Sequence, residues 1–386
     1  MIDRMQLGEV PAKPHTVFRS AAGALRFEEC FTRLGFDGEF SILYHESSPT
    51  ADRAIGLSEP GPHERKAPAW EAEQPLRRRL VLGGKAPEGW TPVCGNTDVV
   101  VSFFDLPAAG PAPGSGFANG DGDDLLYVFS GAATLESPFG DLEVVAGDYV
   151  LVPRSVVHRW RISERFTGIA FELRGGFHVP AQFRNPVGQL RMDAPFTHRD
   201  FRRPVFRGPR PGPREVLVKK GDRFVRREPA ASPFDVVGWD GTVWPFAFPI
   251  LGFQAKTGLV HLPPTIHATF AARGALVCSF VPRVTDTHPD AIPCPYPHSS
   301  VDCDELIYYV RGNFTSRRGV GPQALSLHPA GIPHGPHPGA YEGSIGTRST
   351  DELAVMVDTF LPLRLTEQAV ALEEPGYHDS WTEVVP

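Results

Sequence analysis

Short apolar stretches separated by turn residues run along most of the chain. From residue 98 they include DVVVSFFDL, DLLYVFSG, AATLES, DLEVVAGDYVLVP and HRWRIS, and the pattern resumes after residue 232 with GALVCSFVPR, ELIYYVRGNF, ALSLHP and LAVMVDTFLP. These stretches are rich in β-branched and aromatic residues and are bounded by Gly, Pro or Asp, which is typical of strands joined by turns. The sequence therefore predicts an all-β protein with two strand-rich regions.

The segments outside these two regions have a different character. Residues 1–95 contain one clear strand, FSILYH at 40–45, followed by a polar, Pro-rich run. A segment rich in Arg and Pro interrupts the strand pattern between the two β regions. The predicted organisation is an N-terminal arm with few strands (1–95), a first β domain (96–188), a linker with connecting strands (189–231), a second β domain (232–365) and a C-terminal tail that could cap it (366–386).

Composition narrows the class of protein. The 386 residues include 39 Gly and 40 Pro, which suits many turns, and 41% are hydrophobic, which suits a globular chain. A formal net charge of −7 argues against a nucleic-acid partner, because such binding depends on Lys and Arg. Five cysteines without a CxxC pair favour a reducing compartment, and no apolar run is long enough for a signal peptide or a membrane span. We expect a cytoplasmic protein that acts on a small molecule.

The two β regions share one spacing of chemically distinctive residues. Each region has an acidic residue, six further residues and a glycine, followed later by Pro-x-small-x-x-His. In the second region these positions are Glu305, Gly312, Pro329, Gly331 and His334. In the first region they are Asp124, Gly131, Pro153, Ser155 and His158, with Gly147 preceding the proline. A spacing repeated in this way predicts two related domains.

This spacing resembles the two cupin motifs, G(x)5HxH(x)3-4E(x)6G and G(x)5PxG(x)2H(x)3N, and implies a bicupin made of two jelly-roll β-barrels. In the second copy His298 lies seven residues before Glu305, at the first histidine of the motif, while Ser300 occupies the second histidine position. With His334, this leaves two imidazoles and a carboxylate, which suits iron(II) with open positions for substrate and dioxygen. Zinc enzymes use the same ligand types, so the ligands alone do not fix the metal.

Two further expectations follow from the motif copies. In the strand ELIYYV the alternation of side chains puts Glu305 on the same face as Ile307 and Tyr309, and it turns Asp304 away from Glu305. The first copy has no histidine near residues 117–120 and has Asp124 in place of the glutamate. The first barrel is therefore expected to bind no metal and to be structural.

Over residues 95–365 the chain also resembles the homogentisate 1,2-dioxygenases. The stretches that carry this resemblance are ANGDGDDLLYVFSG, SPFDVVGWDGTVWPF, DELIYYVRGNF and SLHPAGIPHGP, in the order of that family. The resemblance implies His298, Glu305 and His334 as ligands of Fe(II). It also implies His261 as the acid–base histidine, with His267 as the weaker candidate for that role. The residues implied in substrate binding are His328, Arg317, Phe314, Tyr296 and His267.

Residues around the implied ligands differ from the family pattern, and this limits what the resemblance implies about the substrate. The implied reaction is the O2-dependent cleavage of homogentisate to maleylacetoacetate by a homo-oligomer of undetermined size. Phe314 stands where the family has a tyrosine, however, and it cannot donate a hydrogen bond to a substrate hydroxyl. Phe314 therefore favours, as an alternative, a dioxygenase for another hydroquinone acid such as gentisate. A cupin isomerase or a metal-binding protein without oxygen chemistry also stays open.

Overall fold

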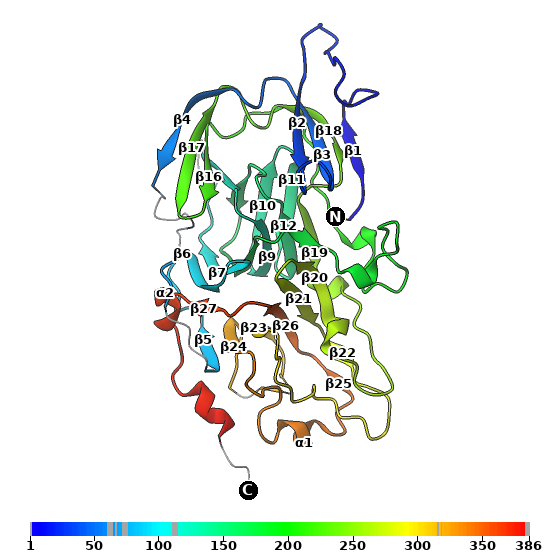
Figure 1. Cartoon of the computed structure of the whole chain (residues 1–386), viewed down its shortest axis with the longest axis vertical. Helices are drawn as coiled ribbons and strands as arrows, with labels where there is room; N and C mark the ends of the chain where they lie inside the picture. Colours follow the sequence, from blue (N-terminus) through cyan, green and yellow to red (C-terminus); the bar gives the residue numbers. More distant parts are fainter. Residues whose placement is uncertain are drawn as a thin grey trace. The chain divides into compact units, whose positions relative to one another are not determined.

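The computed structural model describes residues 2–59, 65, 68–71, 76–109, 115–314, 316–317 and 319–382 (Figure 1). The described residues form many short strands and only a few helical turns, so the prediction of an all-β protein is confirmed. None of the helices in these ranges has the length and apolar character needed to cross a membrane. Contacts divide the chain into two compact units, each built from three separate segments.

Unit 1 consists of Met1–Ala67, Leu106–Thr167 and His198–Phe248. One of its sheets has the order β1-β18-β3-β2, a second β4-β17-β16-β8 and a third β11-β10-β13, while β12 pairs with β9. The strands are β1 (Met5–Gly8), β2 (Phe27–Thr32), β3 (Phe40–His45), β4 (Asp52–Ser58), β8 (Ser115–Asn119), β9 (Asp123–Ser130), β10 (Ala132–Ser137), β11 (Gly140–Val145), β12 (Asp148–Val152), β13 (Arg159–Ile162), β16 (Glu215–Lys220), β17 (Arg223–Pro229), β18 (Val236–Gly241) and β19 (Phe246–Pro249), whose last residue lies outside the unit, with the 3-10 turn η2 (His198–Asp200).

Unit 2 consists of Pro68–Asp105, Gly168–Thr197 and Pro249–Pro386. Its large sheet has the order β15-β20-β21-β26-β23-β24-β5, and β7 pairs with β6, which pairs with β27. The strands are β5 (Arg78–Val81), β6 (Gly89–Gly95), β7 (Val99–Leu106), β14 (Phe166–Leu173), β15 (Phe177–His178), β20 (Ala268–Ala272), β21 (Ala275–Phe280), β22 (Arg283–Val284), β23 (Asp304–Arg311), β24 (Ala324–His328), β25 (Ser349–Thr350), β26 (Leu353–Thr359) and β27 (Arg364–Leu365). The last residue of β7 and the first two residues of β14 lie outside the unit. The helical turns are η1 (Ala181–Phe183), η3 (Ile250–Gly252), η4 (Pro264–His267), α1 (Ala340–Ser344), α2 (Glu367–Val370) and η5 (Tyr377–Trp381).

The register of β23 in the large sheet is fixed by what its two faces bury. Leu306 and Tyr308 are fully buried, and complete burial of an apolar side chain contributes about 1.5–3 kcal/mol. A slip of one residue would turn these side chains to the opposite face. Glu305 is paired in register with Asp358 of β26, on the face opposite to Leu306. Hydrophobic burial on one side of β23 therefore holds Glu305 in place on the other.

The N-terminal segment differs from the prediction. Instead of the single strand at 40–45, residues 1–95 contain six strands, β1 to β6, counted over the described residues. The strand β3 pairs with β18, almost two hundred residues further along the chain. As a result β18 belongs to unit 1, although its sequence was assigned to the second β domain. The barrel boundaries at 96–188 and 232–365 stay predictions, because compact units defined by contacts need not coincide with barrels.

The two motif copies occupy equivalent positions in the two units. Asp124 is the second residue of β9, and Glu305 is the second residue of β23. Seven residues before each acid, a residue forms an antiparallel bridge with the histidine of its own copy. This bridge joins Phe117 to His158 in unit 1, and the same bridge joins two histidines in unit 2. The repeated spacing in the sequence therefore corresponds to a repeated structure.

An arginine lies beside the acidic residue of the first motif copy. Arg65 forms an ion pair with Asp124, and its guanidinium lies 5.6 Å from the ring centroid of Phe117. Burial lowers the pKa of His158 to about 4, so this histidine is neutral near pH 7. An arginine thus supplies positive charge beside the acid of the first copy.

Candidate metal centre

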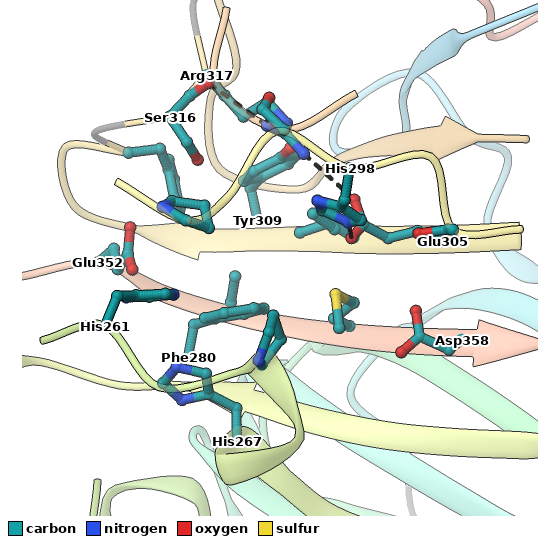
Figure 2. Close-up of a pocket in the computed structure, with 18 of the residues that line it drawn as sticks. His261, His267, Phe280, His298, Glu305, Tyr309, Ser316, Arg317, Glu352 and Asp358 are labelled. Carbon is teal, nitrogen blue, oxygen red and sulfur yellow. Dashed lines mark hydrogen bonds and ion pairs between the residues drawn. The ribbon is translucent and has the colours of Figure 1, made fainter. Parts of the chain in front are cut away.

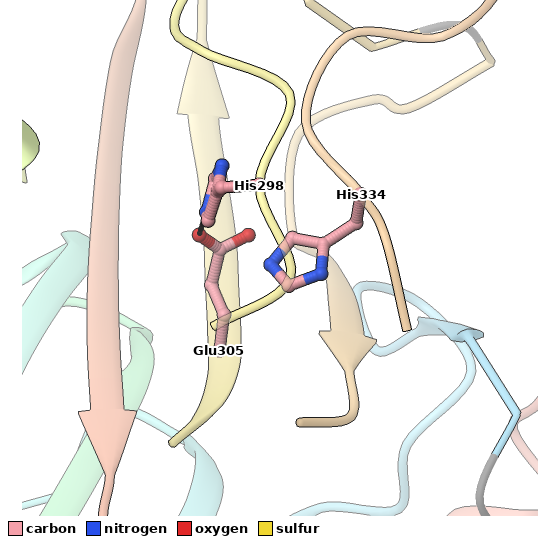
Figure 3. Close-up of side chains that lie close together, drawn as sticks. All are labelled: His298, Glu305 and His334. Atoms are coloured by element: carbon pink, nitrogen blue, oxygen red, sulfur yellow. Dashed lines mark ion pairs between the residues drawn. The ribbon is translucent and has the colours of Figure 1, made fainter. Parts of the chain in front are cut away.

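Two loops and one strand of unit 2 bring the three predicted ligands together. His298 precedes β23, Glu305 lies on β23, and His334 follows β24. The two histidines form reciprocal backbone hydrogen bonds, with N–O distances of 2.8 and 2.7 Å. One ligand atom from each of the three side chains lies within 4.8 Å of the others, as Figure 3 shows. Within the described part of the chain, this is the one group of such residues close enough to hold a metal ion.

Backbone carbonyl groups orient both imidazoles of the cluster. The Nδ1 atom of His298 lies 2.7 Å from the carbonyl oxygen of Tyr296, and Nδ1 of His334 lies 2.8 Å from that of Ile332. Because a carbonyl only accepts, each Nδ1 carries the proton and donates it. In the neutral imidazoles each Nε2 then carries a lone pair. Nε2 of His298 is 3.7 Å from Oε2 of Glu305, and this carboxylate raises the pKa of His298. Fixing the tautomer through the other ring nitrogen is characteristic of histidines that bind metals.

Two further side chains hold the carboxylate of the cluster. Oε1 of Glu305 lies 2.9 Å from Nδ1 of His328 and 3.2 Å from Nη2 of Arg317. Burial alone would raise the pKa of Glu305, but the neighbouring imidazoles of His298 and His328 and the charge of Arg317 hold it well below its usual value. The acid is therefore ionised across the physiological range. Oε1 accepts the hydrogen bonds from His328 and Arg317, whereas Oε2 faces His298.

A cavity of about 190 Å³ adjoins the cluster. In Figure 2, Glu305, Tyr309 and Arg317 lie on one side of it, with His261, His267 and Phe280 across from them. The lining residues are His261, Pro264, His267, Phe280, Arg283, Pro293, Pro295, His298, Ser300, Cys303, Glu305, Ile307, Tyr309, Phe314, Ser316, Arg317, Gly335, Glu352, Ala354, Met356 and Asp358. The mixture of apolar walls and a few polar groups is typical of small-molecule sites.

Comparison with known proteins gives the family of the chain. The sequence model of the family described as "Homogentisate 1,2-dioxygenase N-terminal" matches residues 93–250. A protein of Saccharolobus solfataricus, named a "putative dioxygenase", is 35% identical over 379 residues, which cover 97% of each chain. The chain belongs to the homogentisate 1,2-dioxygenase family. It is an enzyme of the dioxygenase type.

Other relatives in the family match over a smaller part of their length. The homogentisate 1,2-dioxygenase of Rhodopseudomonas palustris is 28% identical, and the match covers 69% of this chain and 62% of that protein. The chain therefore spans less than two thirds of that relative. Among solved structures, a cupin 2 conserved barrel domain protein from Leptotrichia buccalis aligns with a TM-score of 0.35 and 9% identity, over 74% of this chain and 97% of that one.

The residues that the family resemblance implies at the site divide into two groups. His261, His267, Phe314 and Arg317 line the cavity. His328 and Tyr296 are not among its lining residues. His328 is fully buried behind Glu305, whereas Tyr296 is half exposed and donates its hydroxyl to the carbonyl oxygen of His261 at 2.9 Å.

The two cavity histidines differ in how readily they take up a proton. Burial lowers the pKa of both, but that of His267 falls to about 3, while the carboxylate of Asp286 partly offsets the effect at His261. Nδ1 of His261 lies 3.5 Å from Oδ2 of Asp286, and its Nε2 is buried without a hydrogen-bond partner among the described residues. His261 is thus the better placed to accept a proton near pH 7.

Several residues at the site were not predicted from the sequence. Asp358 lines the cavity, and burial followed by the charge of Glu305 raises its pKa to about 7. Arg283 and Glu352 form an ion pair at 2.8 Å on the cavity wall. The alternation of apolar and polar residues in DELAVMVDTF would have placed Asp358 on the face of Met356, but nothing in the spacing shows that β26 pairs with β23 and sets Asp358 beside Glu305.

Proposed function

We propose that the chain is an iron(II)-dependent dioxygenase that opens the ring of a small hydroquinone acid. Homogentisate is the first substrate to test, with maleylacetoacetate as the product. The main support is the convergence of His298, Glu305 and His334 beside a cavity. Two imidazoles and one carboxylate are the ligand set of non-haem Fe(II) oxygenases, in which the remaining metal positions stay open.

The donor set fits a divalent iron ion in charge as well as in ligand type. The carboxylate is ionised, and the two Nε2 atoms carry lone pairs because both Nδ1 atoms donate to carbonyl groups. Bound iron would acidify a ring hydroxyl of the substrate and bring the substrate and O2 together. Both atoms of O2 enter the product as the bond between the ring carbon bearing the acidic side chain and the adjacent hydroxylated carbon breaks.

The surrounding residues supply binding and proton transfer. His261 has a free, buried Nε2 at the cavity and would take the proton of a ring hydroxyl. Arg317 would hold the carboxylate of the substrate, since its Nε is buried without a hydrogen-bond partner among the described residues. Phe280 and the prolines of the wall exclude water from the ring.

A second candidate is a sister dioxygenase for another hydroquinone acid, such as gentisate. The observation that favours it is Phe314, which lines the cavity and packs edge-on against Tyr309 at 4.6 Å between ring centroids. A phenyl ring offers no hydrogen bond to a substrate hydroxyl at this point. The homo-oligomeric state, the cytoplasmic location and the absence of nucleic-acid and membrane partners remain predictions.

A matched pair of substitutions tests the assignment of the metal centre. His334→Ala removes a proposed ligand, and His158→Ala removes the histidine at the equivalent position of unit 1. We expect His334→Ala to lose bound iron and O2-dependent turnover, and His158→Ala to keep one iron per chain. Full iron content and turnover in His334→Ala, with circular dichroism showing both variants folded, would refute the assignment.

A further inference from the structure

We infer that the C-terminal segment Tyr377–Trp381 is a positioning element of the metal centre, which acts on Glu305 through His328. The inference rests on the proposed function only in that the site binds iron. These positioning residues need not touch the substrate. They hold His328, which engages one oxygen of the carboxylate, so that the other oxygen is presented to the metal.

The carboxylate of Glu305 is held from one side only. His328 and Arg317 both approach Oε1, at 2.9 and 3.2 Å, whereas Oε2 is 3.7 Å from the Nε2 atom of His298. Two donors on one oxygen fix the rotation of the carboxylate group about its terminal bond. His328, the closer of the two donors, therefore sets the position of Oε2, whereas the positive charge of Arg317 also competes with a metal ion for the carboxylate.

The C-terminal segment contacts both of these side chains. Trp381 lies 6.1 Å from the ring of His328 between centroids, and the guanidinium of Arg317 lies 5.6 Å from the Trp381 ring. The ring of His328 also stacks on that of His334, with 5.2 Å between the ring centroids and 14° between the planes. His328 is thus packed between a proposed ligand and the C-terminal segment.

A hydroxyl group of the segment matches the tautomer that His328 requires. The ionised Glu305 only accepts, so Nδ1 of His328 donates to it and Nε2 carries the lone pair. The hydroxyl of Tyr377 lies 3.4 Å from that Nε2, a long hydrogen bond in which the tyrosine donates. Both residues are buried, so if the hydroxyl of Tyr377 is removed, no water molecule from bulk solvent can replace it as a donor to Nε2 of His328. The tyrosine thus favours the tautomer that supports Glu305.

The segment is anchored independently of the metal centre. Upstream of it, Val81 donates a backbone hydrogen bond to Leu372 at 3.0 Å, and Glu374 donates one to Arg79 at 2.8 Å. The C-terminal residues therefore run along the free edge of β5 in the large sheet, where Figure 1 shows them in red. Arg79 also lies 5.3 Å from the ring centroid of Tyr377. The positioning residues are thus attached to the same sheet that carries Glu305.

The test compares two hydroxyl deletions that differ in location. Tyr377→Phe removes the hydroxyl beside His328, and Tyr308→Phe removes a buried hydroxyl on the opposite face of β23. The affinity of each purified protein for ferrous ammonium sulfate is measured anaerobically against a chromogenic chelator. The electron paramagnetic resonance spectrum of the Fe(II)–nitric oxide complex reports the symmetry around the iron.

We expect Tyr377→Phe to weaken Fe(II) binding about tenfold, at the low end for loss of an outer-shell partner, and to alter the resonance spectrum. Tyr308→Phe should leave both unchanged. In a His328→Phe background, Tyr377→Phe should cause no further loss, because its effect passes through His328. A Trp381→Leu variant that folds normally should also bind iron more weakly.

Three outcomes would overturn the inference. Unchanged affinity and spectrum in Tyr377→Phe would show that the segment only packs against the site. The same loss in the His328→Phe background would show that the effect of Tyr377 does not pass through His328. A parent protein that binds no Fe(II) would overturn the proposed function as well. Because both readouts are taken without substrate, an error in the assigned substrate leaves the result unaffected.

Discussion

Replacement of Arg317 by methionine should destabilise the metal-free protein while tightening its hold on a divalent metal. The side chain of Arg317 is 4% exposed, with Nη2 3.2 Å from Oε1 of Glu305. It also donates to the carbonyl oxygen of Gly335. Removal of one partner of a buried ion pair costs about 3–5 kcal/mol. His328 still donates to Glu305, so we expect the low end, about 3 kcal/mol.

A metal ion at the site changes this result because it supplies the positive charge that Arg317 supplied. The remaining loss is that of the hydrogen bond to Gly335, about 1–2 kcal/mol. The difference between the two states, about 1–2 kcal/mol, must appear as tighter metal binding, because the two equilibria are linked. At about 1.4 kcal/mol per factor of ten, Arg317→Met should bind a divalent metal roughly tenfold more tightly.

Thermal unfolding with and without metal measures this directly. For a unit of about 200 residues, 3 kcal/mol corresponds to a fall in Tm of roughly 6–12 °C in the metal-free protein, and the fall should be clearly smaller with Zn(II) or Fe(II) bound. Arg283→Met is the control, because Arg283 lines the same cavity but pairs with Glu352. Equal falls in both states, or weaker metal binding in Arg317→Met, would refute the proposed balance of charge at Glu305.

Three further predictions concern other groups. Asp286→Asn removes a charge that raises the pKa of His261. The acid limb of the pH profile of kcat/KM, where His261 becomes protonated, should therefore move to lower pH. An unchanged acid limb would exclude His261 as the base. Burial lowers the pKa of His45, but its hydrogen bonds to Asp235 and Glu29 raise it to about 9, so His45 adds up to about 3 kcal/mol of stability below pH 6.5 that is lost as the pH rises to 9. Chemical unfolding across that range should show this slope, and His45→Gln should flatten it. Arg65→Met should lower the free energy of unfolding in urea by about 3 kcal/mol, because it leaves Asp124 buried without its ion-pair partner. Adding Asp124→Asn should recover part of this loss. No loss in Arg65→Met would show that the ion pair does not stabilise the fold.

The proximity of His298, Glu305 and His334 could be predicted because it depends on local patterns. Alternation along β23 places Glu305, Ile307 and Tyr309 on one face, and all three line the cavity. Asp304 points elsewhere, as expected, and accepts hydrogen bonds from the backbone of Ala330 and Leu363. A strand period of two and the fixed spacing to the histidine are properties of the sequence itself.

Other parts of the site depend on contacts between distant residues, which no spacing reveals. Tyr377 and His328 are 49 positions apart in the chain, and the C-terminal tail contains no sequence motif that would predict their contact. The strand β4 was hidden in a polar run because it pairs with β17 and exposes most of its side chains. Edge strands with exposed side chains lack the apolar pattern that identifies buried ones.

The central claim is tested most directly by oxygen uptake. The purified protein would be loaded anaerobically with Fe(II), transferred to an oxygen electrode, and given homogentisate, gentisate and plain hydroquinone in parallel, with ultraviolet absorbance followed at the same time. The account predicts consumption of one O2 per molecule of substrate and a new absorbance from a ring-opened acid, with either homogentisate or gentisate. Protein that holds one iron per chain and yet consumes no oxygen with any of the three would contradict it.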